Sequence, residues 1–162
     1  MNRERKVIEP NAIIVFDRNV KASELNLIAK DFNGDVIITK KLMIDSDLNI
    51  EYNLHVISDI MCRSKMFEHN INIKGDLYCY GKISCHDINV WQNFYCEDII
   101  YSTDIKVGGD MCSNNTIHAY GHKIVVAGNL NCEGIVAEDV AVLGRLNIQG
   151  TISASKSIKI GY

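Results

Sequence analysis

Cysteine is the residue type with the widest chemical repertoire in this chain, and six are present. Cys62, Cys79 and Cys96 follow one another at intervals of 17 residues, and Ser113 and Cys132 continue the row. A row of thiols suggests a metal ladder, but tetrahedral zinc needs ligands that converge from different directions, and the sequence contains no C-x-x-C pair. We therefore interpret the row as small, soft core residues and expect neither a metal nor a cofactor.

Asparagine and aspartate recur in two further rows. One row consists of Asp59, Asp76, Asn93, Asp110 and Asn129, and the other consists of Asn53, Asn70, Asp87, Asp104 and Asp139. A pair of carboxylates would suit the cleavage of sugar chains. Asparagine and aspartate also favour turns, because their side chains bond the local backbone and tolerate left-handed conformations. We favour the turn interpretation and expect a non-enzyme, with a polysaccharide lyase or a sugar acyltransferase as the less favoured alternative.

The five histidines show no spacing typical of a metal site. His118 and His122 are four residues apart but lie on the two sides of a predicted turn. Either one would serve as the catalytic histidine of a hexapeptide acyltransferase only if the chain formed a left-handed β-helix.

An internal repeat accounts for these rows. Apolar pairs of the form large-x-small occur three times in each repeat, as in Leu77-x-Cys79, Ile83-x-Cys85 and Ile88-x-Val90. The first pair of successive repeats begins at residues 42, 60, 77, 94, 111, 130 and 146, which gives steps of 18, 17, 17, 17, 19 and 16 residues. This alignment places the pairs at 42, 60 and 77 on one face and includes a strand at Met66-x-Glu68.

Residues two apart on a strand point to the same side, so each pair predicts a short strand with two inward side chains. Three strands joined by short turns close a triangle, and stacked triangles bury the apolar pairs. We therefore predict an all-β fold in which residues 36–162 form a right-handed parallel β-helix of about seven triangular coils with a 17-residue repeat. The alternative is a left-handed β-helix, although its stricter six-residue pattern fits less well.

The repeat resembles the bactofilin family of bacterial polymer-forming proteins. The resemblance rests on the coil length and on two phrases, one of which is Gly-Asp/Asn followed by an apolar residue. This phrase occurs at Gly75-Asp76-Leu77, Gly109-Asp110-Met111 and Gly128-Asn129-Leu130, and the second phrase is Gly150-Thr151-Ile152-Ser153-Ala154. The resemblance implies a self-associating cytoskeletal scaffold with a β-helical fold.

Residues 1–35 are less regular than the rest of the chain, and we expect them to form a cap or an irregular first coil. Residues 22–27 resemble the later strand phrases. The same stretch also suggests a short helix with Ser23 as N-cap and with Leu25, Ile28 and Phe32 on one face. Either structure would cover the open end of the rod.

Large side chains at outward positions predict two interaction surfaces. Six of them should gather along one edge of the middle coils: Met61, Phe67, Tyr78, Tyr80, Tyr95 and Tyr101. An exposed aromatic patch of this kind is typical of an interface. The last coil supplies the second surface through Ile158, Ile160 and Tyr162, since the edge of a final coil favours association.

The net charge of −3 and the pI near 5.9 disfavour non-specific nucleic-acid binding. The apolar run AIIVF is too short for a membrane span or a signal peptide, so we expect a cytoplasmic protein without a disulfide framework. We therefore predict a non-catalytic structural protein that associates with itself through its coil ends or its aromatic edge. The alternatives are a protein-binding inhibitor or adaptor, such as a phage-encoded one, and a glycan-binding module.

Overall fold

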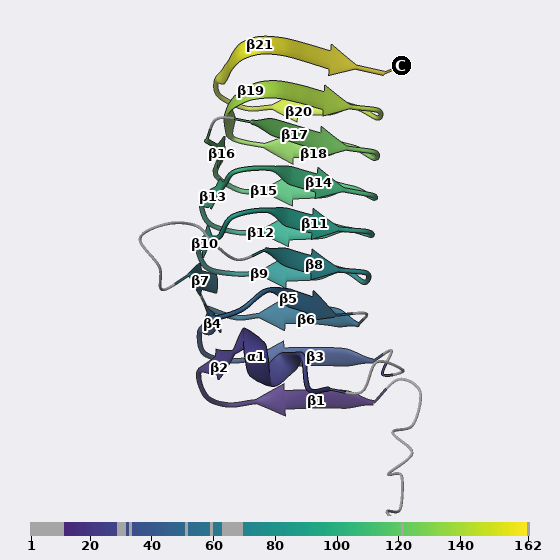
Figure 1. Cartoon of the computed structure of the whole chain (residues 1–162). Helices are drawn as coiled ribbons and strands as arrows, with labels where there is room; N and C mark the ends of the chain where they lie inside the picture. Colours follow the sequence, from purple (N-terminus) through teal and green to yellow (C-terminus); the bar gives the residue numbers. More distant parts are fainter. Residues whose placement is uncertain are drawn as a thin grey trace, which may run out of the picture.

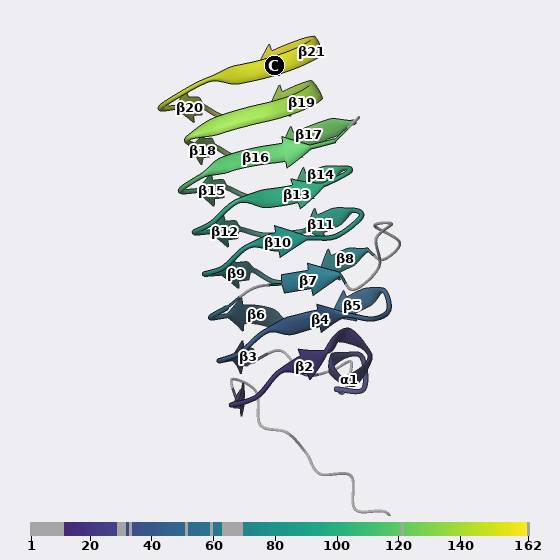
Figure 2. The same cartoon turned by 90° about the vertical axis from the view of Figure 1, so that its left-hand side faces the viewer.

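The computed structural model describes residues 12–28, 32, 34–50, 52–58, 60–62, 70–120 and 122–161, with Met61 and Cys62 described only as strand positions. Within these ranges the chain forms strands that pair in parallel and one helical turn, stacked as a β-solenoid of about seven turns (Figures 1 and 2). The prediction of an all-β parallel helix is confirmed. The right-handed sense of the coil stays a prediction.

The solenoid has three faces, and the first, face A, is an eight-stranded sheet. Its strands, in order of stacking, are β1 (Ile13–Phe16), β3 (Asp35–Ile38), β6 (Asn53–Val56), β9 (Leu77–Cys79), β12 (Phe94–Cys96), β15 (Met111–Ser113), β18 (Leu130–Cys132) and β20 (Leu146–Ile148). Each strand of face A begins one coil.

The second and third faces, B and C, belong to one thirteen-stranded sheet that folds around a corner. Face B contains β2 (Val20–Lys21), β4 (Leu42–Ile44), β7 (Ile60–Cys62), β10 (Ile83–Ser84), β13 (Ile100–Ser102) and β16 (Thr116–Ala119). Face C contains β5 (Leu48–Ile50), β8 (Ile71–Ile73), β11 (Ile88–Val90), β14 (Ile105–Val107) and β17 (Lys123–Val126). In the last two coils a single nine-residue strand runs through both faces, as β19 (Gly134–Val142) and β21 (Ile152–Ile160).

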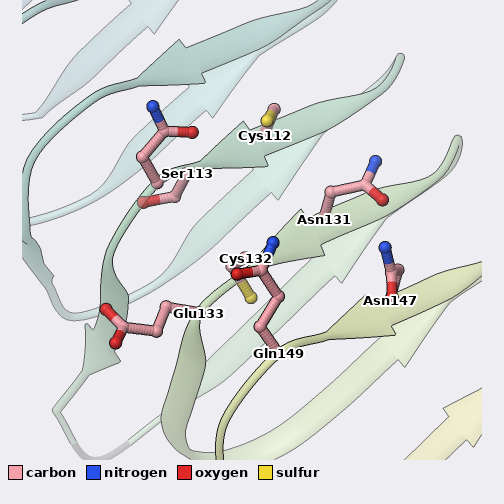
Figure 3. Close-up of a pocket in the computed structure, with 8 residues that line it drawn as sticks. Cys112, Ser113, Asn131, Cys132, Glu133, Asn147 and Gln149 are labelled. Carbon is pink, nitrogen blue, oxygen red and sulfur yellow. The ribbon is translucent and has the colours of Figure 1, made fainter.

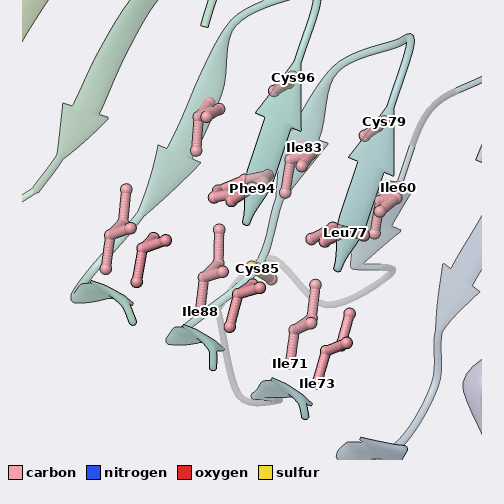
Figure 4. Close-up of a cluster of buried hydrophobic side chains, with 14 of the residues drawn as sticks. Ile60, Ile71, Ile73, Leu77, Cys79, Ile83, Cys85, Ile88, Phe94 and Cys96 are labelled. Atoms are coloured by element: carbon pink, nitrogen blue, oxygen red, sulfur yellow. The ribbon is translucent and has the colours of Figure 1, made fainter. Parts of the chain in front are cut away.

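The core lies along the axis, where the inward residues of the three faces meet. On face A the first inward position passes from Leu54 through Leu77 and Phe94 to Met111, and these side chains are buried. Figure 4 shows Leu77 and Phe94 beside Ile60 and Ile83 of face B and Ile71 and Ile88 of face C. Burying one such aliphatic side chain stabilises the fold by about 1.5–3 kcal/mol. Each coil buries these side chains against the coils next to it, so no coil is stable without its neighbours.

The predicted alignment of the first coils is wrong. Ile60 pairs with Ile83 and lies on face B, whereas Leu77 pairs with Leu54 on face A. On face A, the Asp76 amide bonds the side chain of Asn53, which lies 23 residues earlier, whereas the Asn93 amide bonds Asp76, which lies 17 residues earlier. The coil that contains β7 and β8 is therefore longer than the next one. The extra residues fall between β7 and β8, and most of them, with the predicted strand at Met66-x-Glu68, lie outside the described residues. The error arose because the same large-x-small pattern occurs on all three faces and does not mark which face a pair belongs to.

Of the two structures expected for residues 22–27, the helix is confirmed and the strand is wrong. β1 and β2 pair with β3 and β4, and the helical turn α1 (Ala22–Leu25) takes the place of a strand on face C. Leu25 and Phe32 are buried in the core, and Ile28 packs partly against it. The expected N-cap is wrong, because Lys21 holds that position and Ser23 instead donates from its backbone N–H and its Oγ to the Asp45 carboxylate at 3.0 and 2.8 Å.

Within the described part of the chain, no helix has the length and apolar character that a membrane crossing requires.

Candidate functional site

The cysteine row lies in the core of face A. Cys79 and Cys96 are partners in neighbouring strands, and their Sγ atoms donate to the backbone carbonyls of Gly81 and Asp98, both at 3.2 Å. The hydrogen bond with Cys79, followed by burial, raises the pKa of the Cys96 thiol. A buried, protonated thiol is a poor nucleophile and a poor metal ligand. Cys62 does not belong to this row, because it pairs with Ile44 on face B.

Among the described residues, no group of three or more histidine, cysteine, aspartate or glutamate side chains is arranged to hold a metal ion.

The rows of asparagine and aspartate form ladders that bond the backbone. On face A, the side-chain oxygens of Asn53, Asp76, Asn93 and Asp110 each accept a hydrogen bond from the amide of the next member of the row, at 2.6–3.0 Å. A second ladder leads from Asp47 through Asn70 and Asp87 to Asp104. Asn53 therefore belongs to the face A ladder and not to the second row. The cause is the same wrong alignment of the first coils that misplaced Ile60. The turn interpretation accounts for these side chains, which are occupied with backbone amides.

The predicted aromatic edge divides into two groups. On face A, Tyr78 stacks on His55 with ring centroids 4.7 Å apart, and Tyr80 contacts Tyr95 at 5.7 Å. On face B, Tyr101 stacks on His118 at 5.1 Å and on Tyr120 at 5.7 Å. Met61 lies in the same outward column as Tyr101, with Ser84 between them, and Phe67 lies outside the described residues. The role of the edge as an interface stays a prediction.

Two exposed aromatic residues, Tyr120 and Trp91, were not among the residues expected from the sequence. Both lie in the turns that follow a strand, and a search restricted to strand positions misses them. The position of Tyr120 directly after β16 offers the only sequence signal, because a turn residue there lies beside the outward column of face B.

A polar hollow of about 180 Å³ opens on face A near the last coils (Figure 3). It is lined by Cys112, Ser113, Asn114, Asn131, Cys132, Glu133, Asn147 and Gln149. Cys112, Asn131 and Asn147 are successive outward residues of β15, β18 and β20, so the parallel register places them one above another. The sequence did not indicate this group, because Asn114, Glu133 and Gln149 come from the adjoining turns and not from the strands.

The last coil exposes residues that belong to the core ladders. Ile152, Ile158 and Ile160 of β21 are 37%, 46% and 51% exposed. Their register partners in the preceding coil, Ile135, Val140 and Val142, are completely buried. Ile158 and Ile160 thus lie where the sequence placed them, in an uncovered coil, and Tyr162 lies outside the described residues.

Comparisons with known proteins found no family model, no curated protein and no solved structure that matches this chain. The fold is therefore established from the structure alone, and the resemblance to bactofilins enters only as a proposal.

Proposed function

We propose that this protein is a non-catalytic structural module that associates with itself through its last coil. The observation that carries the proposal is the contrast between Ile158 of β21 and its partner Val140, which occupy the same ladder with exposures of 46% and 0%. Large apolar side chains in a continuous row on a soluble surface mark an association site.

The backbone of β21 supports the same conclusion. β21 pairs with β19 along one edge, and its other edge has no strand partner among the described residues. A nine-residue edge strand presents N–H and C=O groups that another strand can bond. A partner strand would satisfy these groups and cover the three isoleucines together.

A second copy of this chain fits this edge best. If two β21 strands pair antiparallel about Lys156, Ile152 of one copy lies opposite Ile160 of the other, and the apolar residues of both copies stay on the core side. The Lys156 ammonium bonds the Glu138 carboxylate of its own chain, which offsets the repulsion between two lysines at the centre. The resemblance to the polymer-forming bactofilins also supports self-association, and the proposal includes the expected cytoplasmic location.

The test is the molar mass in solution over a range of concentrations, measured by light scattering after size-exclusion chromatography. The unmodified protein should form a discrete dimer, and the double variant Ile158→Lys with Ile160→Lys should be monomeric, because two charges would be buried in the new sheet. The matched control is Val136→Lys, an exposed outward position of the preceding coil, which lies outside the proposed interface and should leave the dimer intact.

A monomer at every concentration would refute the proposal, as would a dimer that survives the double lysine substitution with its circular dichroism spectrum unchanged. Filaments in electron micrographs that disappear in the double variant would support self-association through this coil but replace the closed dimer with an open assembly.

A further inference from the structure

The polar hollow on face A contains amide groups that the fold does not use. The side chains of Asn131 and Asn147 are exposed neighbours in β18 and β20, and Figure 3 shows both amides directed out of the sheet. Among the described residues, neither side chain has a hydrogen-bond partner, and the same holds for the side chains of Glu133 and Gln149 that border them.

The asparagines of face C show that such a row can satisfy itself. Asn72 donates from Nδ2 to the Oδ1 of Asn49 at 3.0 Å, and Asn89 donates to Asn72 at the same distance. These residues are register partners in β5, β8 and β11, as Asn131 and Asn147 are in β18 and β20. The difference is that the face C amides bond one another, whereas the face A amides leave their donors and acceptors open.

Aromatic rings border the hollow on the side of the middle coils. Asn114, which lines the hollow, donates from Nδ2 to the Tyr95 hydroxyl at 3.2 Å. The Tyr95 ring contacts Tyr80, which is 43% exposed. A ligand that leaves the amides toward the middle coils therefore meets an apolar ring surface.

We propose that the hollow and the adjoining tyrosines bind a neutral oligosaccharide. An amide carries both donors and an acceptor, so a pair of them matches adjacent sugar hydroxyls, which also donate and accept. Tyrosine rings offer an apolar surface to the C–H groups of a sugar and a hydroxyl at the edge. The eight lining residues include one carboxylate and no basic side chain, which disfavours phosphate and nucleic acid.

The solenoid register favours a chain of several sugars over a single one. The outward column Tyr78, Tyr95, Cys112, Asn131 and Asn147 places one side chain on each coil, and coils are about 4.7–4.9 Å apart. A second hollow shares Asn131 and Asn147 and adds Arg145, so the polar strip extends beyond the first and, with Glu133, contains one charged side chain of each sign. A ligand that crosses several coils would contact amides at one end and tyrosines at the other.

The test is isothermal titration of the full chain with linear hexasaccharides of glucose, of N-acetylglucosamine and of galacturonic acid, and with glucose alone. At least one neutral hexasaccharide should bind at millimolar or lower concentration, and more tightly than glucose. The double variant Asn131→Ala with Asn147→Ala should raise the Kd by about tenfold or more, because the ligand loses hydrogen bonds at two adjacent sites.

The matched control is Asn72→Ala with Asn89→Ala, which removes the same two groups from face C and should leave the Kd unchanged. Absence of binding to every neutral sugar overturns the proposal, and so does binding that the face A substitutions do not weaken. Tighter binding of the galacturonic acid hexasaccharide would overturn the assignment to a neutral sugar. The result is independent of self-association, because the Ile158→Lys and Ile160→Lys variant should bind the sugar as the unmodified chain does.

Discussion

The two ends of the solenoid meet the same physical problem in different ways. At the first coil, α1 closes the end of face C, with Ala22 and Leu25 completely buried. At the last coil, the side chains of Ile158 and Ile160 are about half exposed. A stack of coils leaves unpaired backbone groups and core side chains at each end, and the proposed self-association would cover those of β21.

On face C, α1 also satisfies part of the backbone edge of this coil, whereas β1 and β2 each have a strand partner on one side only among the described residues. Asn26, directly after α1, donates from its Nδ2 to the Asp47 carbonyl at 2.7 Å and accepts from the Asn49 amide at 3.0 Å. One side chain thereby supplies the two bonds that a neighbouring strand would make to β5. Among the described residues, no side chain does the same for β21.

The largest expected effect comes from opening the closed end. Leu25→Ala should lower the free energy of unfolding by about 2–5 kcal/mol, because it leaves a cavity under α1 where no solvent reaches. Ile158→Ala, at the open end, should cost less than about 1 kcal/mol, because half of that side chain is already in water. Urea unfolding below the concentration at which copies associate measures both, and similar costs would abolish the distinction between the ends.

A smaller effect should follow from removing the Asn26 side chain, which bonds the backbone beside β5 in place of a neighbouring strand. Asn26→Ala should cost about 1–3 kcal/mol, because the Asp47 carbonyl and the Asn49 amide each lose a partner. Hydrogen exchange of the Asn49 amide should accelerate more than that of the amides of β14 in the middle of the stack. Equal acceleration at both places would indicate a global loss of stability and not a local opening.

The smallest expected effect is a dependence of the closed end on pH. Burial opposes ionisation of Asp45, but the hydrogen bonds from the backbone and side chain of Ser23 hold the pKa of this carboxyl below its usual range. A carboxyl with a lowered pKa stabilises the fold above its unfolded pKa of about 3.9, and the contribution is lost as pH falls through the folded value. The protection factors of the α1 amides, which correct for the fall of the intrinsic exchange rate with pH, should therefore decrease below about pH 4.

The control for this effect is Asp45→Asn, in which the protection factors of the α1 amides should change little over the same pH range. An unchanged decrease in that variant would assign the effect to other carboxyl groups.

The sequence predicted the fold well where the repeat length varies only between 16 and 19 residues. From Leu77 to Ile160 the inward residues, the turns and the pairing follow the steps that were counted along the chain. The prediction failed at Ile60, because a longer connection changes the step there and the apolar pairs look alike on every face. Its consequence was to place Met61 beside Tyr78, although these residues lie on different faces.

The candidate sites were predicted in part for a related reason. Ile158 and Ile160 were predicted from their place in the last strand, and the structure shows both partly exposed, while their role as an interface stays a prediction. The hollow was missed because its lining combines outward strand residues, such as Asn131, with turn residues, such as Gln149. Whether a turn residue lies beside one face or the next depends on the angle at which the chain bends between two faces. The sequence alone does not predict that angle.

By itself the sequence determined that this protein is a stack of short parallel strands with an apolar core, since an alternation of two residues fixes which side chains point inward. It also determined that one row of asparagine and aspartate, with Asp76, Asn93 and Asp110, lies in the turns before the strands of face A. Only the tertiary structure decided which pairs share a face, that α1 closes one end, and that the amides of face A stay open while those of face C bond one another. These properties depend on distances between residues about 16–23 positions apart, and such distances are set when the coils stack and not by the local sequence.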